Sequence, residues 1–201
     1  MFRLAFLFLF LSLSHFLLAA DSLFVKVHFV YGSKPKSAFK KTEAKQFGGI
    51  HGGHVYLELE NRIISYGTNN GKWHIFPHKS KSAGKYRIDK DLKWHGDTGK
   101  LKITTIVIPI TEEQSLKFKE TEKIYFEKTP YDYAFLGMRC AAGAYDVLSK
   151  AQVCKCKSRF GTISKNFYPK RLRVKLLKRA QKENWQVLRQ YVRSTRKCEN
   201  D

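Results

Sequence analysis

Strand patterns occupy the first half of this chain and helix patterns the second half, and this order most limits the folds open to it. Apolar and polar residues alternate over Phe24–Tyr31 and over His54–Glu60, as in strands with one buried face. Asn61 marks a tight turn, after which Arg62–Tyr66 returns as the second arm of a hairpin. Leu101–Ile110 is rich in β-branched residues and predicts a further strand.

Three other segments of the first half have weaker patterns. Trp73–Phe76 and Tyr86–Ile88 are short and predict short strands. Gly32–Gly53 is rich in Lys and Gly and predicts a loop that ends in a close or sharp turn.

The helix patterns begin at Thr111. Thr111-Glu112-Glu113-Gln114 is a capping box, and the core stripe expected to follow it is Leu116, Phe118, Ile124 and Tyr125. A second helix begins at Cys140, with a buried face of Ala141, Ala142, Ala144, Val147 and Leu148. A third begins at Pro169, with Leu172, Leu176 and Ala180 on one face. A last helix is predicted to carry Trp185, Leu188 and Tyr191 or Val192. Strands followed by helices predict an α+β domain.

The first twenty residues have the layout of a secretory signal peptide. Arg3 supplies positive charge, Leu4–Leu18 is a largely apolar run, and Ala20 precedes the polar Asp21. The run is shorter than the roughly 20 residues of a membrane-spanning helix. We therefore expect export to the periplasm or the medium, with cleavage near Ala20 and a single α+β domain over residues 21–201.

Charge is unevenly distributed along the chain. The sequence has 38 Lys and Arg against 17 Asp and Glu, and the segment Ala151–Asp201 alone has 15 basic residues against three acidic ones. Basic C-terminal helices could bind an anionic lipid or polymer surface, or could serve only solubility. The sequence has neither zinc-finger spacing nor a nucleic-acid motif, so no specific nucleic acid partner is expected. A hydrophobic content of 43% excludes the disordered class.

Four cysteines are present, and export would permit disulfides between them. Cys154 and Cys156 are too close for an easy mutual bridge, so we expect Cys198 to pair with one of them. Zinc binding by these three thiols is the alternative. Cys140 has different surroundings and stands apart.

Two segments carry the residue types of a thiol site. Gly52-Gly53-His54 leads directly into a strand, and Arg139-Cys140 begins the Ala-rich helix. A helix N-terminus stabilises a thiolate, and a neighbouring imidazole can serve as base and then as acid. The alternatives are a buried structural thiol at Cys140 and a structural polar residue at His54. His51 is three residues from His54, but no carboxylate cluster accompanies them, so no metal is expected.

The residues around both segments resemble the NlpC-like branch of the papain-like fold. Gly53–Arg62 resembles its histidine hairpin, and Asp132-Tyr133 with Arg139–Leu148 resembles its cysteine helix. His precedes Cys, as in circularly permuted members that include lecithin:retinol acyltransferase-like proteins. The resemblance covers residues 50–150 and implies an antiparallel sheet with packed helices. Arg139 departs from the family, which often has Asn or another small polar residue there, and this leaves open an altered or an inactive site.

The resemblance implies a nucleophile, a base and a third polar group. Cys140 matches the nucleophile and His54 the base. For the third role we expect Tyr66, which should lie near His54 across the hairpin. Glu58 and His74 are alternatives.

The oxyanion of such a reaction needs a hydrogen-bond donor. The backbone N–H of Cys140 is the expected donor, because the first N–H groups of a helix have no intrahelical partner. Tyr131 or Tyr133, just ahead of the nucleophile, could contribute a hydroxyl.

These features predict an exported cysteine hydrolase or acyltransferase of papain-like type. Cys140 would attack an amide or ester carbonyl with His54 as base, and no cofactor is expected. By analogy with the family, cell-wall peptide is the first substrate and lipid ester the second. The alternative is a non-catalytic basic protein that binds anionic polymers or lipid surfaces, in which Cys140 is inert.

Overall fold

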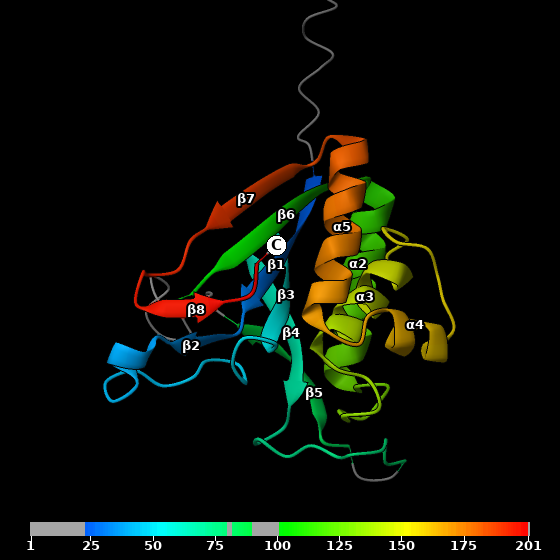
Figure 1. Cartoon of the computed structure of the whole chain (residues 1–201). Coiled ribbons are helices and arrows are strands. Elements are labelled where there is room, and N and C mark those ends of the chain that lie inside the picture. Colours follow the sequence, from blue (N-terminus) through cyan, green and yellow to red (C-terminus); the bar gives the residue numbers. More distant parts are fainter. Residues whose placement is uncertain (1–22, 80–81, 90–100, 201) are drawn as a thin grey trace, which may run out of the picture.

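The computed structural model describes residues 23–79, 82–89 and 101–200. Its centre is a six-stranded antiparallel sheet in the order β5-β4-β3-β1-β6-β7, with the helices packed together on one side (Figure 1). The α+β class, the antiparallel sheet and the packed helices are therefore confirmed. The predicted signal peptide lies outside the described residues. The six strands are β1 (Leu23–Tyr31), β3 (Gly53–Leu59), β4 (Arg62–Thr68), β5 (Gly84–Asp89), β6 (Ile103–Ile110) and β7 (Gln186–Gln190).

A small second sheet and four α-helices complete the described part of the chain. β2 (Ser33–Pro35) pairs with β8 (Arg196–Cys198). The 3₁₀ helix η1 (Ser37–Phe39) follows β2 inside the segment predicted as a loop. The α-helices are α2 (Glu112–Glu127), α3 (Cys140–Lys150), α4 (Arg159–Lys165) and α5 (Pro169–Glu183). None of these described helices is long and apolar enough to cross a bilayer.

The predicted hairpin is confirmed as β3–β4. Glu60 and Asn61 both have positive φ, 49° and 64°, which is the backbone of the two-residue turn that matches the twist of antiparallel strands. Leu59 therefore pairs with Arg62, and Tyr56 with Ser65.

Strand alternation divides the apolar residues of the sheet between its two faces. On β3, Val55, Leu57 and Leu59 belong to the main core with the helices, whereas Tyr56 belongs to a smaller cluster on the other face. Helix α3 is buried along most of its length and packs on β3 and β4. Only the side chains on the helix-facing side of β3, such as Val55 and Leu57, can therefore pack against α3.

Helix α2 begins as predicted, but its buried stripe differs from the predicted one. The Thr111 hydroxyl accepts a hydrogen bond from the Gln114 N–H, and the capping box is complete. Phe118 and Tyr125 are buried as expected, but Leu116 is 61% and Ile124 52% exposed. Successive residues of a helix are only about 100° apart around its axis. The sequence pattern therefore predicted a helix but not which of its faces packs on the sheet.

The predicted last helix is wrong, because this segment forms the edge strand β7. Asn184 adopts a left-handed conformation, with φ 54°, and ends α5. The chain then reverses, and Val187 pairs with Ile106 on the open edge of β6. Pairing with the edge of β6 therefore outweighs the helical spacing of the apolar residues in this segment. No local sequence pattern indicates that this edge is available. The basic C-terminal region is therefore two helices followed by two strands.

Of the two short strands predicted, one is confirmed. Tyr86–Ile88 lies within β5, whereas Trp73–Phe76 forms only an isolated bridge at His74 to Ala134. Ala134 lies 60 residues further along the chain, in the loop before α3. The segment Trp73–Phe76 is therefore held by this loop and not by a strand of the sheet.

The four cysteines are free thiols in the structure, so the expected bridge from Cys198 is not formed there. Cys154 lies beside Arg179 of α5, at 3.9 Å, whereas Glu199, next to Cys198, contacts Arg173 of the same helix at 2.9 Å. Six residues of helix span about 9 Å, and a disulfide needs Cα atoms within about 7 Å. Cys154 and the residue after Cys198 thus contact arginines of α5 that lie six residues apart, and no bridge from Cys198 to Cys154 or Cys156 is formed.

A partly buried ionic cluster joins β1 to β3, and it leads to a prediction about the pH dependence of stability. Glu58 accepts from Lys26 Nζ at 2.5 Å and contacts His28 Nε2 at 2.9 Å. The His28 hydrogen bond, together with Lys26, outweighs burial and lowers the pKa of Glu58 to about 2. A carboxylate with a lowered pKa stabilises the fold above its unfolded pKa, about 4.5 here, and this stabilisation is lost as the pH falls towards 2.

We expect Glu58→Gln to lower the unfolding free energy at pH 7 by about 1–2 kcal/mol, a figure reduced for solvent screening. Urea unfolding at pH 7, 4 and 2.5 measures this, and the difference from the wild type should shrink as the pH falls below 4.5. Glu60→Gln is the matched control, because its ion pair with Lys119 is about half exposed on both sides and should contribute less than about 0.5 kcal/mol. An equal effect of both substitutions at all three pH values would contradict the prediction.

Candidate functional site

A tight backbone turn over residues 47–53 leads directly into β3, which contains His54. Gly52 N–H donates to the Gly49 carbonyl at 3.0 Å, and Gly53 N–H donates to the Phe47 carbonyl at 3.2 Å. A Cβ on Gly52 would lie 1.4 Å from the Phe47 oxygen, so only glycine fits at this point of the turn. His54 follows as the second residue of β3.

Cys140 is the first residue of α3, as predicted. Arg139 is the extended N-cap residue, and its carbonyl accepts from the Gly143 N–H at 2.8 Å. The Cys140 Sγ lies 4.0 Å from the Gly53 carbonyl oxygen and also faces the Val55 N–H. The thiol therefore lies against the edge of β3, beside the two backbone groups that flank His54.

Burial controls the titration of this thiol. Cys140 is only 4% exposed, and burial raises its pKa; the Arg139 guanidinium and the N–H groups of Val55, Ala141 and Cys140 offset part of that rise. The helix N-terminus thus acts in the direction predicted, but desolvation is larger. The resting thiol is neutral at pH 7.

The His54 ring lies on the other face of β3. Its centroid is 4.6 Å from the Tyr56 ring and 6.2 Å from the Phe47 ring, and Tyr56 belongs to the smaller cluster away from the helices. The structure therefore brings the thiol to the His54 backbone while the imidazole stacks elsewhere.

Tyr66 packs against α3, on the opposite face of the sheet from the His54 ring. The register Tyr56↔Ser65, extended by one residue, places Tyr66 opposite Val55, whereas the sequence analysis placed it opposite His54. The Tyr66 hydroxyl donates to the Tyr131 carbonyl at 3.3 Å, and burial raises its pKa. Its ring packs so closely on Gly143 that a Cβ there would lie 2.8 Å from it. These contacts are those of a packing residue.

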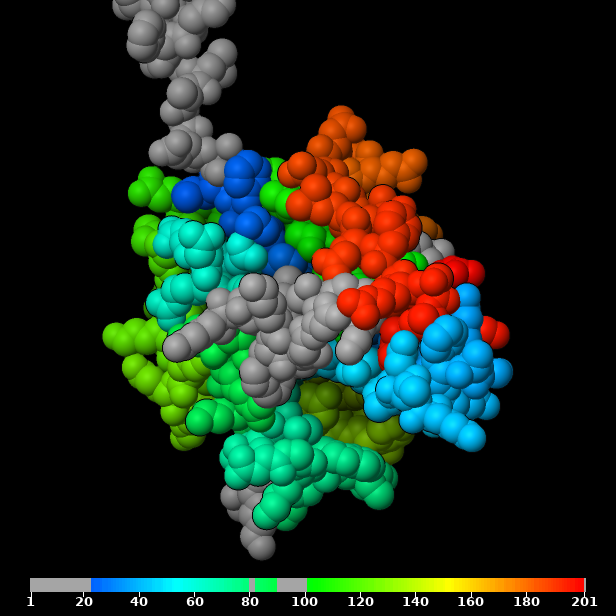
Figure 2. Space-filling model, turned by 90° about the vertical axis from the view of Figure 1, so that its left-hand side faces the viewer, coloured from blue at the N-terminus to red at the C-terminus, as the bar shows by residue number. Residues whose placement is uncertain are grey.

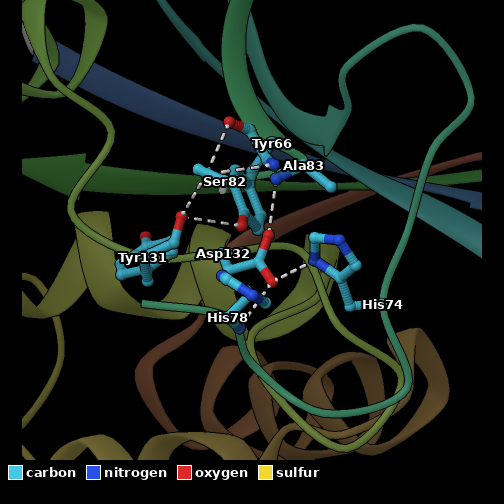
Figure 3. Close-up of polar contacts among 8 residues, drawn as sticks. Tyr66, His74, His78, Ser82, Ala83, Tyr131 and Asp132 are labelled. Carbon is cyan, nitrogen blue, oxygen red and sulfur yellow. Dashed lines mark hydrogen bonds and ion pairs between the residues drawn. The ribbon is translucent and has the colours of Figure 1, made fainter. Parts of the chain in front are cut away.

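Of the alternatives for the third role, Glu58 is engaged with Lys26 and His28 as described above, and His74 belongs to a cluster around Asp132 (Figure 3). His74 Nδ1 lies 2.6 Å from the Asp132 carboxylate, which also accepts from the His78 N–H at 2.9 Å and the Ala83 N–H at 2.6 Å. Burial raises the pKa of Asp132, but the two backbone N–H groups and His74 outweigh it, so the pKa is lowered.

This Asp132 cluster positions the segment that leads to the thiol. It joins His74, His78 and Ala83 to the start of the segment that leads to Cys140, eight residues after Asp132. Sequence analysis quoted Asp132 only as part of a motif and did not identify its role, since its partners are contributed by a loop about 50 residues earlier.

Tyr133 is the tyrosine that lies at the thiol. Burial and then the nearby Cys140 raise the pKa of its hydroxyl, and the Arg139 guanidinium offsets part of that rise. Tyr131, the other candidate, contacts the Tyr86 hydroxyl in the core. The Tyr133 side chain and the Cys140 N–H at the start of α3 are thus both close to the thiol, where an oxyanion would need hydrogen-bond donors.

Arg139 is enclosed by aromatic rings. Its guanidinium carbon lies 5.3 Å from the Phe135 centroid, 5.0 Å from Phe167 and 5.2 Å from Tyr168. Its Nη1 atom is buried and makes no hydrogen bond to the described residues. Arg139, the residue that departs from the pattern of the NlpC-like family, is therefore held in an aromatic cage next to Cys140 in the sequence.

Within the described residues, no group of three or more His, Cys, Asp or Glu side chains is placed to hold a metal ion. In comparisons with known proteins, no family model, no curated protein and no solved structure matches the chain. The functional argument therefore depends on the site alone.

Proposed function

We propose that this chain is an exported thiol hydrolase or acyltransferase of papain-like, NlpC-like type, with Cys140 as nucleophile and His54 as base. The observation that carries the proposal is the position of Cys140 Sγ, at the start of α3 and 4.0 Å from the carbonyl of the residue before His54. The hairpin and the helix that the family resemblance requires are both present. Export is supported by the sequence of the first twenty residues.

In the proposed reaction, Sγ attacks the carbonyl carbon of an amide or ester while its proton passes to the imidazole of His54. The oxyanion lies beside the Cys140 N–H and the Tyr133 hydroxyl. The C–N or C–O bond then breaks, and the imidazolium protonates the leaving amine or alcohol. Water or an acceptor alcohol attacks the thioester with His54 again as base, which releases the product and restores the thiol.

Two features shape this mechanism. Because burial raises the pKa of Cys140, His54 has to remove the proton during the attack, and a resting ion pair is not part of the proposal. The His54 ring also has to leave the Phe47 and Tyr56 rings and reach the strand edge. Tyr66 has no place in this scheme.

The test is the rate of iodoacetamide labelling of Cys140 in a background where the other three cysteines are Ser. At pH 7 we expect His54→Ala to lower this rate at least tenfold, because general-base assistance typically contributes more than that. His51→Ala is the matched control, since His51 lies three residues away on the exposed side of the turn. Acyl transfer from an activated ester should be lost in Cys140→Ala. Labelling that is the same with and without His54 would overturn the assignment.

A second function is favoured by the 4% exposure of Cys140. In it the chain is a non-catalytic binding protein, and its basic surface binds anionic polymers or lipid. This function predicts slow, His54-independent labelling of Cys140 and binding that survives Cys140→Ala.

A further inference from the structure

Five large apolar side chains are exposed together on two neighbouring segments, and we call them the apolar patch. Their exposed fractions range from 44% to 68%. The patch consists of Trp73, Ile75, Phe76, Phe135 and Leu136.

Backbone pairing holds the two segments of the patch side by side. The Phe135 N–H donates to the His74 carbonyl at 2.7 Å, and the Leu136 N–H donates to the Ile75 carbonyl at 2.8 Å. The Trp73 and Phe135 rings are 6.4 Å apart. The segment that follows β4, residues 69–79, projects from one end of the molecule (Figures 1 and 2). The five exposed side chains therefore lie on two segments that are paired side by side, and they are not scattered over the molecule.

The exposed charged side chains of the three segments around the patch are all cations; of the acidic groups that contact these segments, Asp132 is buried against His74 and Glu199 is paired with Lys170 at 3.2 Å. Residues 69–79, 133–139 and 164–171 contain no Asp or Glu. The third of these segments joins the patch through Phe167, whose ring lies 5.8 Å from that of Phe135. The exposed cations of these segments are Lys72, Lys79, Lys165, Lys170 and Arg171.

We infer that the apolar patch is a docking surface for an anionic lipid bilayer. Exposed aromatic and aliphatic side chains enter the interfacial region of a bilayer, and Lys and Arg around them attract anionic headgroups. The absence of acidic residues from these three segments favours this occupant over a protein partner of mixed charge. Part of the basic C-terminal region, from Lys165 to Arg171, thereby contributes to the surface.

Docking on a bilayer would also affect which substrates reach the Cys140 thiol. Phe135 packs against Arg139, which immediately precedes Cys140, so the patch and the proposed nucleophile adjoin each other. A bilayer on the patch would bring lipid esters to this end of the molecule. The docking itself does not depend on the proposed catalysis and would persist in Cys140→Ala.

The first test is sedimentation of the purified protein with vesicles of phosphatidylcholine containing about one third phosphatidylglycerol. We expect the double variant Trp73→Ser, Phe76→Ser to bind at least tenfold more weakly, because two large side chains no longer enter the bilayer. The matched control is Leu116→Ser, Ile124→Ser, which removes two exposed apolar residues from α2 and should bind as the wild type does. Equal binding by the two double variants, or no binding by the wild type, would overturn the inference.

A second measurement locates the bound face. Lipids brominated on their acyl chains should quench tryptophan fluorescence in the wild type, and Trp73→Phe should lose this quenching while it retains binding. Binding should weaken with added salt and on vesicles of phosphatidylcholine alone. A patch that instead joins two copies of the chain, seen as a dimer without lipid that Trp73→Ser, Phe76→Ser dissociates, would contradict bilayer docking.

Discussion

Arg196→Met should lower the free energy of unfolding by about 4 kcal/mol, because it breaks a buried ionic and hydrogen-bonded cluster. The Arg196 side chain is 1% exposed and donates to Glu43 at 2.5 Å. It also donates to the Ser33 hydroxyl at 2.9 Å and to the Ala44 carbonyl at 2.7 Å. Its removal leaves the Glu43 carboxylate, 19% exposed, without this cation, and separates the β2 segment from β8.

Chemical denaturation at pH 7 measures this effect. Lys197→Met is the matched control, because Lys197 is the next residue of the same strand and is exposed; its change should stay within about 0.5 kcal/mol. If the two variants unfold at the same denaturant concentration, Arg196 does not hold the C-terminal strand in the way described.

Gly52→Ala should cost about 3 kcal/mol, near the upper end of ordinary overpacking. The new methyl carbon would lie 1.4 Å from the Phe47 carbonyl oxygen, and this neighbour is backbone, which cannot move aside as a side chain can. The turn would have to open, and its hydrogen bonds into β3 would weaken. Because Cys140 Sγ lies against Gly53, the thiol site should be displaced together with the turn.

Thermal or urea unfolding gives the stability, and the labelling rate of Cys140 reports the displacement. Gly67→Ala provides the comparison, because a Cβ on Gly67 would meet nothing within 4 Å and should change stability by less than about 1 kcal/mol. Stability and labelling that are unchanged in Gly52→Ala would show that the turn is looser than its contacts indicate.

Local patterns predicted most of the sheet and the starts of the helices. The alternation from His54 onward defined a strand because one of its faces is buried, and Asn61 indicated the turn because two residues there need positive φ. The capping box at Thr111 likewise indicated the start of α2. Each of these signals depends on residues a few positions apart, so no knowledge of the rest of the chain was needed.

Long-range pairing accounts for the errors. The helical spacing of Trp185 and Leu188 is real, but the free edge of β6 accepts this segment as β7. The place of Tyr66 at the site depended on a hairpin register that differs by one residue, and a one-residue slip moves a side chain to the other face. Asp132, whose partners are His74, His78 and Ala83, had no local signal at all.

By itself, the sequence determined that Cys140 begins a helix and that His54 begins a strand, because capping and periodicity act over a few residues. Only the tertiary structure decided that the thiol is buried against the edge of β3, that the imidazole packs against the Phe47 and Tyr56 rings, and that two apolar segments about 60 residues apart are exposed side by side. The physical reason is that these relations depend on which strand edges and helix faces meet, and their energies come from residues far apart in the chain.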